Sequence, residues 1–116
     1  MHHPKRASKD LTKRCPQFED LARDAGFPKN EIATASYVMW KESRCNPAAH
    51  NAQDPGTGSY GLMQINSVWI PKLIDAGYIK KATDLYDPAT NIKAAFYVWT
   101  ESIRSNNYGW DEWHIW

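Results

Sequence analysis

Apolar side chains recur every three or four residues through much of the chain, which is the spacing of one face of an α-helix. The first such segment runs from Pro16 to Ala25, and Gly26 then stops it. A second helix is predicted from a cap at Asn30 to about Arg44. The pattern therefore predicts a mostly helical first half.

Two further helices are predicted in the second half of the chain. Residues 67–76 have helical spacing, carry Pro71 in the first turn and are followed by Gly77. Asp87 followed by Pro88 is a typical cap and first-turn proline, which begins a long helix through about Arg104. We expect this helix to lie in the core, because one stripe of it is apolar: Ile92, Ala95, Phe96 and Trp99.

Between these helices the composition changes. Residues 47–61 are rich in Asn, Asp, Pro, Gly, Thr and Ser, which favours turns, and YGLMQIN at residues 60–66 predicts a short buried strand or extended segment. Near the end of the chain, Trp110, Trp113 and Trp116 recur every three residues and could form one face of a helical turn. We expect a mostly helical α+β domain with a small β-element.

The length of 116 residues corresponds to one small domain. Residues 1–14 carry five basic side chains and one acidic side chain, whereas the whole chain has a net charge of only +1. We therefore expect a basic, flexible tail at residues 1–14 and one domain at residues 15–116. The tail is either a solvated arm or an arm that is attracted to an anionic polymer.

Charge and hydropathy argue against several classes of protein. A net charge of +1 gives no strong field for nucleic acid. No run of 18 or more apolar residues is present, so we expect no membrane insertion, and the N-terminus lacks the apolar run of an export signal. We expect a soluble monomer.

Cys15 and Cys45 are the only cysteines. Their spacing and the scattered histidines do not supply the ligands of a structural zinc site. The pattern favours a single disulfide, which would close about 31 residues and stabilise the domain by roughly 3.5 kcal/mol in an oxidising compartment. Two buried free thiols are the alternative.

Glu42 interrupts an otherwise apolar face of the second predicted helix, which it shares with Ile32, Ala35, Val38 and Met39. Burying a carboxylate is costly unless the group is paired or protonated, so such a position favours the protonated form that a general acid needs. The alternative is a structural glutamate that reaches solvent or pairs with Lys41 or Arg44.

Two short motifs follow each other at this point of the chain, Glu42-Ser43 and Gly61-Leu62-Met63-Gln64. They resemble the catalytic Glu-Ser and the Gly-Leu-Met-Gln motif of soluble lytic transglycosylases in the lysozyme superfamily. Asn91-Ile92 is similar to a helix that these enzymes place after the β-element, and residues 109–116 are similar to the aromatic end of animal-type lysozymes. The resemblance implies a lysozyme-like fold with the β-element beside an active-site cleft.

The same resemblance implies a peptidoglycan-cleaving muramidase of lytic transglycosylase type. Ser59 stands where animal-type retaining lysozymes carry their second carboxylate, so the scheme has one carboxyl group. Glu42 would protonate the glycosidic oxygen after an N-acetylmuramic acid unit, and the acetamido group would stabilise the cationic centre. Glu42 would then deprotonate the sugar's own 6-hydroxyl to give a 1,6-anhydro product.

Two other functions stay open. Asp54 could hold a water across the cleft, as in an inverting hydrolytic lysozyme, or it could be a turn residue before Pro55. A non-catalytic glycan-binding module would bind sugar rings with aromatic side chains, and Glu42 would then have no catalytic role.

The Ala-Tyr-Asn segment of many lytic transglycosylases is absent, which leaves Tyr97 and Tyr108 as candidates for its tyrosine.

Several residues near the motifs are candidates for binding the glycan. Gln64 and Asn66 alternate in the expected extended segment, so their amides would face the same side. Ser43 resembles the family serine that orients the acid or the substrate, and Trp113 resembles the tryptophan that packs against the catalytic glutamate. The complete candidate set is Ser43, Ser59, Tyr60, Gln64, Asn66, Asn91 and Trp113.

No metal and no cofactor are predicted. His50 and His114 lack a third ligand at a suitable spacing, and the GTG at residues 56–58 does not lie at a strand-to-helix junction. The expected place of action is the cell wall, in an extracellular or periplasmic compartment. Without an export signal, the chain would fit an excised domain of a larger protein or a phage lysin.

Overall fold

Helices and a small sheet make up the part of the chain that this computed structural model describes, residues 9–115. The α-helices are α1 (Glu19–Ala25), α2 (Ile32–Ser43), α3 (Ile70–Asp75) and α4 (Pro88–Arg104). The strands are β1 (His50–Asn51), β2 (Ser59–Tyr60) and β3 (Ile65–Asn66). Short 3-10 turns complete the order: η1 (Pro16–Phe18), η2 (Lys29–Glu31), η3 (Ser67–Trp69), η4 (Ala82–Tyr86) and η5 (Asp111–Trp113). The predicted α+β class is confirmed.

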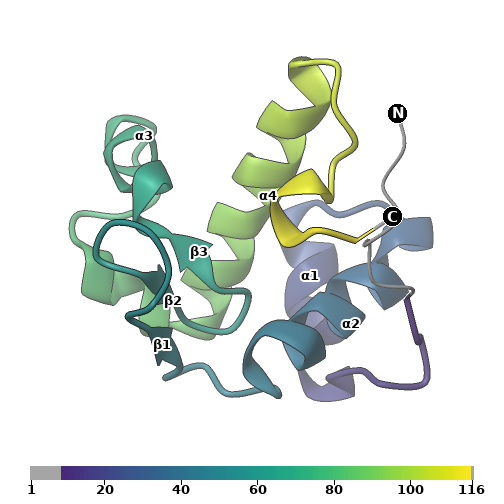
Figure 1. The fold of residues 1–116 in the computed structure, drawn as a ribbon. Helices are drawn as coiled ribbons and strands as arrows, with labels where there is room; N and C mark the ends of the chain where they lie inside the picture. Colours follow the sequence, from purple (N-terminus) through teal and green to yellow (C-terminus); the bar gives the residue numbers. More distant parts are fainter. Residues whose placement is uncertain (1–8, 116) are drawn as a thin grey trace.

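Helix α2 lies in the core. Each residue from Thr34 to Met39 is buried, and α1 packs against both α2 and α4. Figure 1 shows α1 and α2 on one side of α4 and the sheet on the other side. Helix α2 crosses the core before it ends. Its last turn therefore brings Glu42 to the boundary between the helical side, with α1 and α2, and the sheet.

Most predicted helix boundaries are confirmed by local interactions. Gly26 ends α1 with a φ of 117°, and the Asp87 carboxylate accepts a hydrogen bond of 3.0 Å from the backbone N–H of Thr90 at the start of α4. The expected cap at Asn30 is wrong, because the chain enters a helical path directly after Pro28. Asn30 is therefore already inside η2, and Glu31 occupies the cap position of α2.

The three strands form an antiparallel sheet in the order β1-β2-β3. Asn51 pairs with Ser59, and Ser59 pairs with Asn66. The expected β-element is therefore present, but residues 60–66 are not one strand. A tight turn at residues 61–64 reverses the chain, and it requires positive φ angles of 78° at Gly61 and 53° at Gln64.

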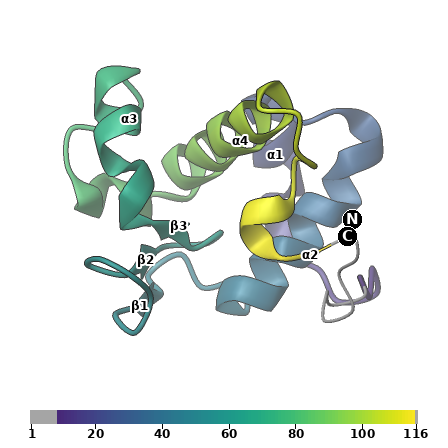
Figure 2. The same ribbon diagram turned by 45° about the horizontal axis from the view of Figure 1, so that its top comes forward.

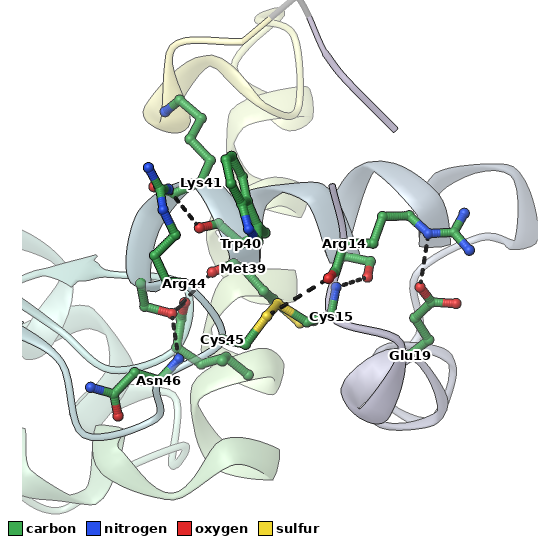
Figure 3. The surroundings of a disulfide bond; sticks show 12 residues. Arg14, Cys15, Glu19, Met39, Trp40, Lys41, Arg44, Cys45 and Asn46 are labelled. Carbon is green, nitrogen blue, oxygen red and sulfur yellow. Dashed lines mark hydrogen bonds and ion pairs between the residues drawn. A yellow bond between two sulfur atoms is a disulfide. The ribbon is translucent and has the colours of Figure 1, made fainter. Parts of the chain in front are cut away.

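A disulfide joins Cys15, before η1, to Cys45, after α2, which confirms the expected bond (Figure 3). Beside it, Arg14 forms an ion pair of 3.3 Å with Glu19, and the Lys13 ammonium lies 4.8 Å from the Trp40 ring. The first eight residues of the expected tail, and Trp116, lie outside the described residues. Among the helices of residues 9–115, none has the length and apolar character needed to span a bilayer.

Candidate active site

A cleft of about 430 Å³ lies between the sheet and the C-terminal segment, which we define as residues 105–115. Figure 2 shows the η5 part of this segment between α4 and α2, on the side of the sheet. The sheet side of the cleft is lined by Asp54, Pro55, Ser59, Gln64, Ile65, Asn66 and Trp69. The opposite side is lined by Lys41, Glu42, Val98, Glu112, Trp113 and His114.

Glu42 occupies the last turn of α2, where Arg44 ends the helix in a left-handed conformation with a φ of 54°. Its side chain is 23% exposed, and its carboxylate accepts a hydrogen bond of 2.8 Å from the Lys41 ammonium. The glutamate expected to face the core is therefore half-buried, paired and open to the cleft. Glu42 is not among the buried residues of α2, so the structure has the alternative, a glutamate paired with Lys41, in place of the expected core-facing acid.

Glu42 also borders a second hollow of about 470 Å³. Lys41, Glu42 and Gln64 line both the cleft and this hollow. The other lining residues of the hollow are Ser43, Arg44, Ala49, His50 and Asn51. A polymeric ligand that extended from the cleft into the hollow would therefore pass the Glu42 carboxylate.

Ser43 links the end of α2 by hydrogen bonds to the turn at residues 61–64, which we call the motif turn. Its hydroxyl lies 2.7 Å from the Leu62 carbonyl and 3.0 Å from the Met39 carbonyl, both of which are acceptors. It also accepts a hydrogen bond of 3.2 Å from the Asn46 backbone N–H. Ser43 lines the second hollow but not the cleft. Its contacts position the segment on which Glu42 stands.

Asn91 does not reach the cleft, contrary to its place in the candidate set. It is fully buried, and its amide donates hydrogen bonds of 2.9 Å to the carbonyls of Tyr60 and Leu85. Its amide oxygen accepts a hydrogen bond of 2.8 Å from the Met63 N–H. These three bonds engage both the nitrogen and the oxygen of the amide. Asn91 therefore holds the motif turn in place from the buried side.

Gln64 and Asn66 both line the cleft, but not for the expected reason. Gln64 belongs to the turn and has a positive φ, so alternation along an extended segment does not apply to it. Its amide donates to the carbonyls of Ala49 (3.1 Å) and Gly61 (2.9 Å). The Asn66 amide donates to the Pro55 carbonyl (3.1 Å), the Gly58 carbonyl (3.2 Å) and the Ser59 hydroxyl (3.2 Å).

Ser59 and Tyr60 differ in position, because adjacent residues of a strand face opposite sides. Ser59 lines the cleft. Tyr60 lines neither hollow: its ring stacks on His50 at 4.6 Å, and its hydroxyl donates to the Thr57 hydroxyl at 2.7 Å. Tyr60 therefore lies away from both hollows, and its expected contact with the glycan stays a prediction.

Trp113 joins the C-terminal segment to both sides of the cleft. Its indole N–H donates a hydrogen bond of 2.8 Å to the Met63 carbonyl in the motif turn. Its own carbonyl accepts a hydrogen bond of 2.9 Å from the Lys41 ammonium. The side chain is buried and lines the cleft next to Glu42, which fits the apolar wall expected of it.

Lys41, Trp69 and Glu112 line the cleft although the sequence patterns did not select them as binding residues. The Trp69 indole N–H donates a hydrogen bond of 3.3 Å to the Glu112 carboxylate, which links η3 to the C-terminal segment. These two residues are 43 positions apart, so no local pattern indicates their contact. His114 also lies in the cleft wall.

The two tyrosine candidates line neither the cleft nor the second hollow. Tyr97 packs against Trp69 and Tyr78, with ring centroids 6.4 and 5.4 Å apart. Burial and the nearby Glu101 carboxylate raise the pKa of the Tyr97 hydroxyl above its ordinary value. Within residues 9–115, no three His, Cys, Asp or Glu side chains gather in a way that could hold a metal ion.

Comparison with known proteins identifies a family that the chain matches. The sequence model of the family described as "Lysozyme like domain" matches residues 19–114, which include Glu42, the motif turn and Trp113. The curated proteins and the solved structures give no significant match. Since the family match covers most of the chain, the protein belongs to the lysozyme-like domain family, which supports a peptidoglycan-related glycosidase or transglycosylase kind of function.

Proposed function

We propose that this protein is a peptidoglycan muramidase of lytic transglycosylase type. It would cut the β-1,4 bond between N-acetylmuramic acid and N-acetylglucosamine. The observation that carries the proposal is the place of Glu42, a half-buried carboxyl group that borders both the cleft and the second hollow. Ser59 lines the same cleft and supplies a hydroxyl where a retaining lysozyme has its second carboxylate.

In the first step, protonated Glu42 donates its proton to the glycosidic oxygen as the C1–O bond breaks. The leaving N-acetylglucosamine unit departs with a free hydroxyl, and Glu42 becomes a carboxylate. Positive charge develops at C1 of the muramic acid unit. The oxygen of its own 2-acetamido group stabilises that charge, so the protein needs no carboxylate nucleophile at Ser59.

In the second step, the Glu42 carboxylate takes the proton from the 6-hydroxyl of the same muramic acid unit. Oxygen O6 attacks C1, the acetamido oxygen is released, and a 1,6-anhydro ring forms. Glu42 ends the cycle protonated, as it began. One carboxyl group therefore serves first as acid and then as base, and no water is consumed.

The residues around Glu42 suit this substrate. Trp69 provides aromatic surface on one side of the cleft, and aromatic rings pack well against the apolar faces of sugars, while the buried Trp113 forms part of the opposite wall. The hydroxyl of Ser59 and the amide oxygen of Gln64 provide polar contacts for acetamido and hydroxyl groups, since the Gln64 amide nitrogen already donates to two backbone carbonyls. The disulfide fits action at the cell wall, in an oxidising compartment.

Asp54 supports a second candidate, an inverting hydrolase. Its side chain lines the same cleft as Glu42 and accepts a hydrogen bond of 3.2 Å from the Asn51 amide. A carboxylate at that position could activate a water on the far side of the sugar. This reaction would give a reducing end in place of an anhydro ring.

The experiment is to measure the release of soluble fragments from purified peptidoglycan by the wild-type protein and three variants. Glu42→Gln should lose at least about a hundredfold in rate, because it removes the transferable proton. Glu112→Gln is the matched control, since it lines the same cleft and its amide oxygen can still accept from Trp69. Asp54→Asn should keep most of the activity.

Each result separates the candidates. Full activity of Glu42→Gln would exclude Glu42 as the acid. Loss of activity in both Glu42→Gln and Asp54→Asn would favour the hydrolase. A wild-type protein that binds peptidoglycan without cleaving it would favour the glycan-binding module.

A further inference from the structure

Lys41 occupies an unusual position beside Glu42. Its ammonium group donates one hydrogen bond of 2.8 Å to the Glu42 carboxylate and another of 2.9 Å to the Trp113 carbonyl. Figure 3 shows the Lys41 side chain extending from α2 toward the C-terminal segment. The side chains of Lys41 and Glu42 are 26% and 23% exposed, so solvent screens the pair only in part.

Helix geometry alone does not produce this contact. Adjacent side chains of an α-helix point about 100° apart, and residues i and i+1 do not face each other. The Lys41 side chain therefore has to bend back toward its neighbour, and the Trp113 carbonyl provides the second acceptor that holds it there. The ammonium group thus depends on the C-terminal segment for its position.

Charged and titratable side chains from several elements line the cleft and the second hollow beside Glu42. Asp54 in the β1–β2 loop and Glu112 in η5 add negative charge to the lining of the cleft. Arg44 adds positive charge to the second hollow, and the titratable His114 and His50 line the cleft and the hollow. Within residues 9–115, the Lys41 ammonium is the cationic group that lies within hydrogen-bonding distance of the Glu42 carboxylate.

We propose that Lys41 is a positioning residue for Glu42: its ammonium group, held by the Trp113 carbonyl, orients the carboxyl group toward the cleft and places a positive charge beside it. The proposal rests on the function proposed above, in which Glu42 is the acid and then the base. A positive charge at this distance favours the carboxylate that Glu42 becomes when it gives up its proton in the first step.

The sign of the effect follows from the charge. Removing the ammonium group takes away a positive charge that favours the carboxylate over the carboxyl group. The alkaline limb of the activity profile, where activity falls as the acid ionises, should then move upward.

The test is the pH dependence of kcat/KM on soluble glycan strands for Lys41→Met, Lys41→Arg and Lys93→Met. Lys41→Met should move the alkaline limb upward. Lys41→Arg keeps the charge and should leave the limb near its wild-type position. Lys93→Met removes an exposed lysine of α4, and is the control for loss of one positive charge. A lower rate with an unmoved limb in Lys41→Met would overturn the proposal.

A second measurement does not depend on activity. In protein labelled with ¹³C at the glutamate carboxyl group, the Glu42 signal should change at a higher pH in Lys41→Met than in wild type. If Lys41→Met does not fold, Lys41→Gln keeps an N–H group for the Trp113 carbonyl and takes its place. An unchanged titration would reject the role of Lys41, whereas full activity of Glu42→Gln would reject the proposed function itself.

Discussion

At the scale of single residues, Asn91 shows how a buried polar side chain shapes the site without touching the ligand. Its three hydrogen bonds hold the backbone of Tyr60, Met63 and Leu85. The motif turn carries Gln64, and Trp113 binds the carbonyl of Met63 in the same turn. The position of both cleft residues therefore depends on Asn91.

Asn91→Ala should lower the free energy of unfolding by at least about 2 kcal/mol, because it removes three buried hydrogen bonds to backbone groups. Chemical denaturation measures this change. Asn107→Ala, at an exposed loop position, is the matched control. A stability of Asn91→Ala within about 0.5 kcal/mol of wild type would show that water or local rearrangement replaces these bonds.

Single residues also differ in how far the sequence alone reveals them. Glu42 could be predicted, because an acid in an apolar helical pattern coincides with a recognisable motif. Lys41 could be named only as an ordinary partner, since neighbours on a helix do not normally face each other. Its second bond is to the carbonyl of Trp113, which lies 72 positions further along the chain.

At the scale of elements, the motif turn depends on a residue without a side chain. A Cβ atom at Gly61 would lie 2.3 Å from the Leu85 carbonyl oxygen and 2.4 Å from the Asn91 amide nitrogen. Backbone and a fully bonded amide cannot move away easily. The positive φ of 78° adds a second reason for glycine at this position.

Gly61→Ala should therefore destabilise the protein by about 2 kcal/mol or more and reduce peptidoglycan cleavage. Gly77→Ala is the control, because Gly77 also has a positive φ but a Cβ there would meet nothing within 4 Å. Thermal unfolding of both variants separates backbone strain from steric contact. Equal losses in the two variants would contradict the close contact at Gly61.

The disulfide stabilises the junction between the start of the fold and the end of α2. It spans 30 positions. The double variant Cys15→Ala/Cys45→Ala should lose about 3 to 4 kcal/mol of unfolding free energy, because the unfolded chain regains the freedom of that loop. Denaturation with and without a reducing agent measures the change. Equal stability of the oxidised and reduced wild-type protein would contradict it.

Elements also show where local signals suffice. Asp87 and Pro88 predicted the start of α4, since a capping carboxylate and a first-turn proline act within one turn. The hairpin at residues 60–66 could not be predicted in the same way. Its turn requires a positive φ at Gln64, a residue type that rarely adopts one. Hydrogen bonds from Asn91 and other distant groups hold the turn in this conformation.

At the scale of the whole molecule, the cleft is assembled by contacts between distant parts of the chain. Trp69 reaches Glu112, and Trp113 reaches Met63, 50 positions away. A sequence pattern can predict helices and turns along the chain, but it gives no distance between them. The family resemblance predicted that a cleft exists, and the packing decides which side chains line it.

A glycan that fills this cleft should stabilise the folded protein. For the Glu42→Gln variant, soluble peptidoglycan fragments at a hundred times their Kd should add about 2.7 kcal/mol, which thermal unfolding detects as a higher Tm. Adding Trp69→Ala should weaken binding at least about tenfold. Trp40→Ala, outside the cleft, is the control. Equal effects of the two tryptophan substitutions would contradict binding in the cleft.

The most direct measurement is mass spectrometry of the fragments that the wild-type protein releases from peptidoglycan, before and after borohydride reduction. Chemistry by Glu42 alone predicts fragments that are one water lighter than hydrolysis products and that borohydride leaves unchanged, and Glu42→Gln should release none of them. Fragments with reducible ends would contradict that chemistry and make Asp54 the missing carboxylate.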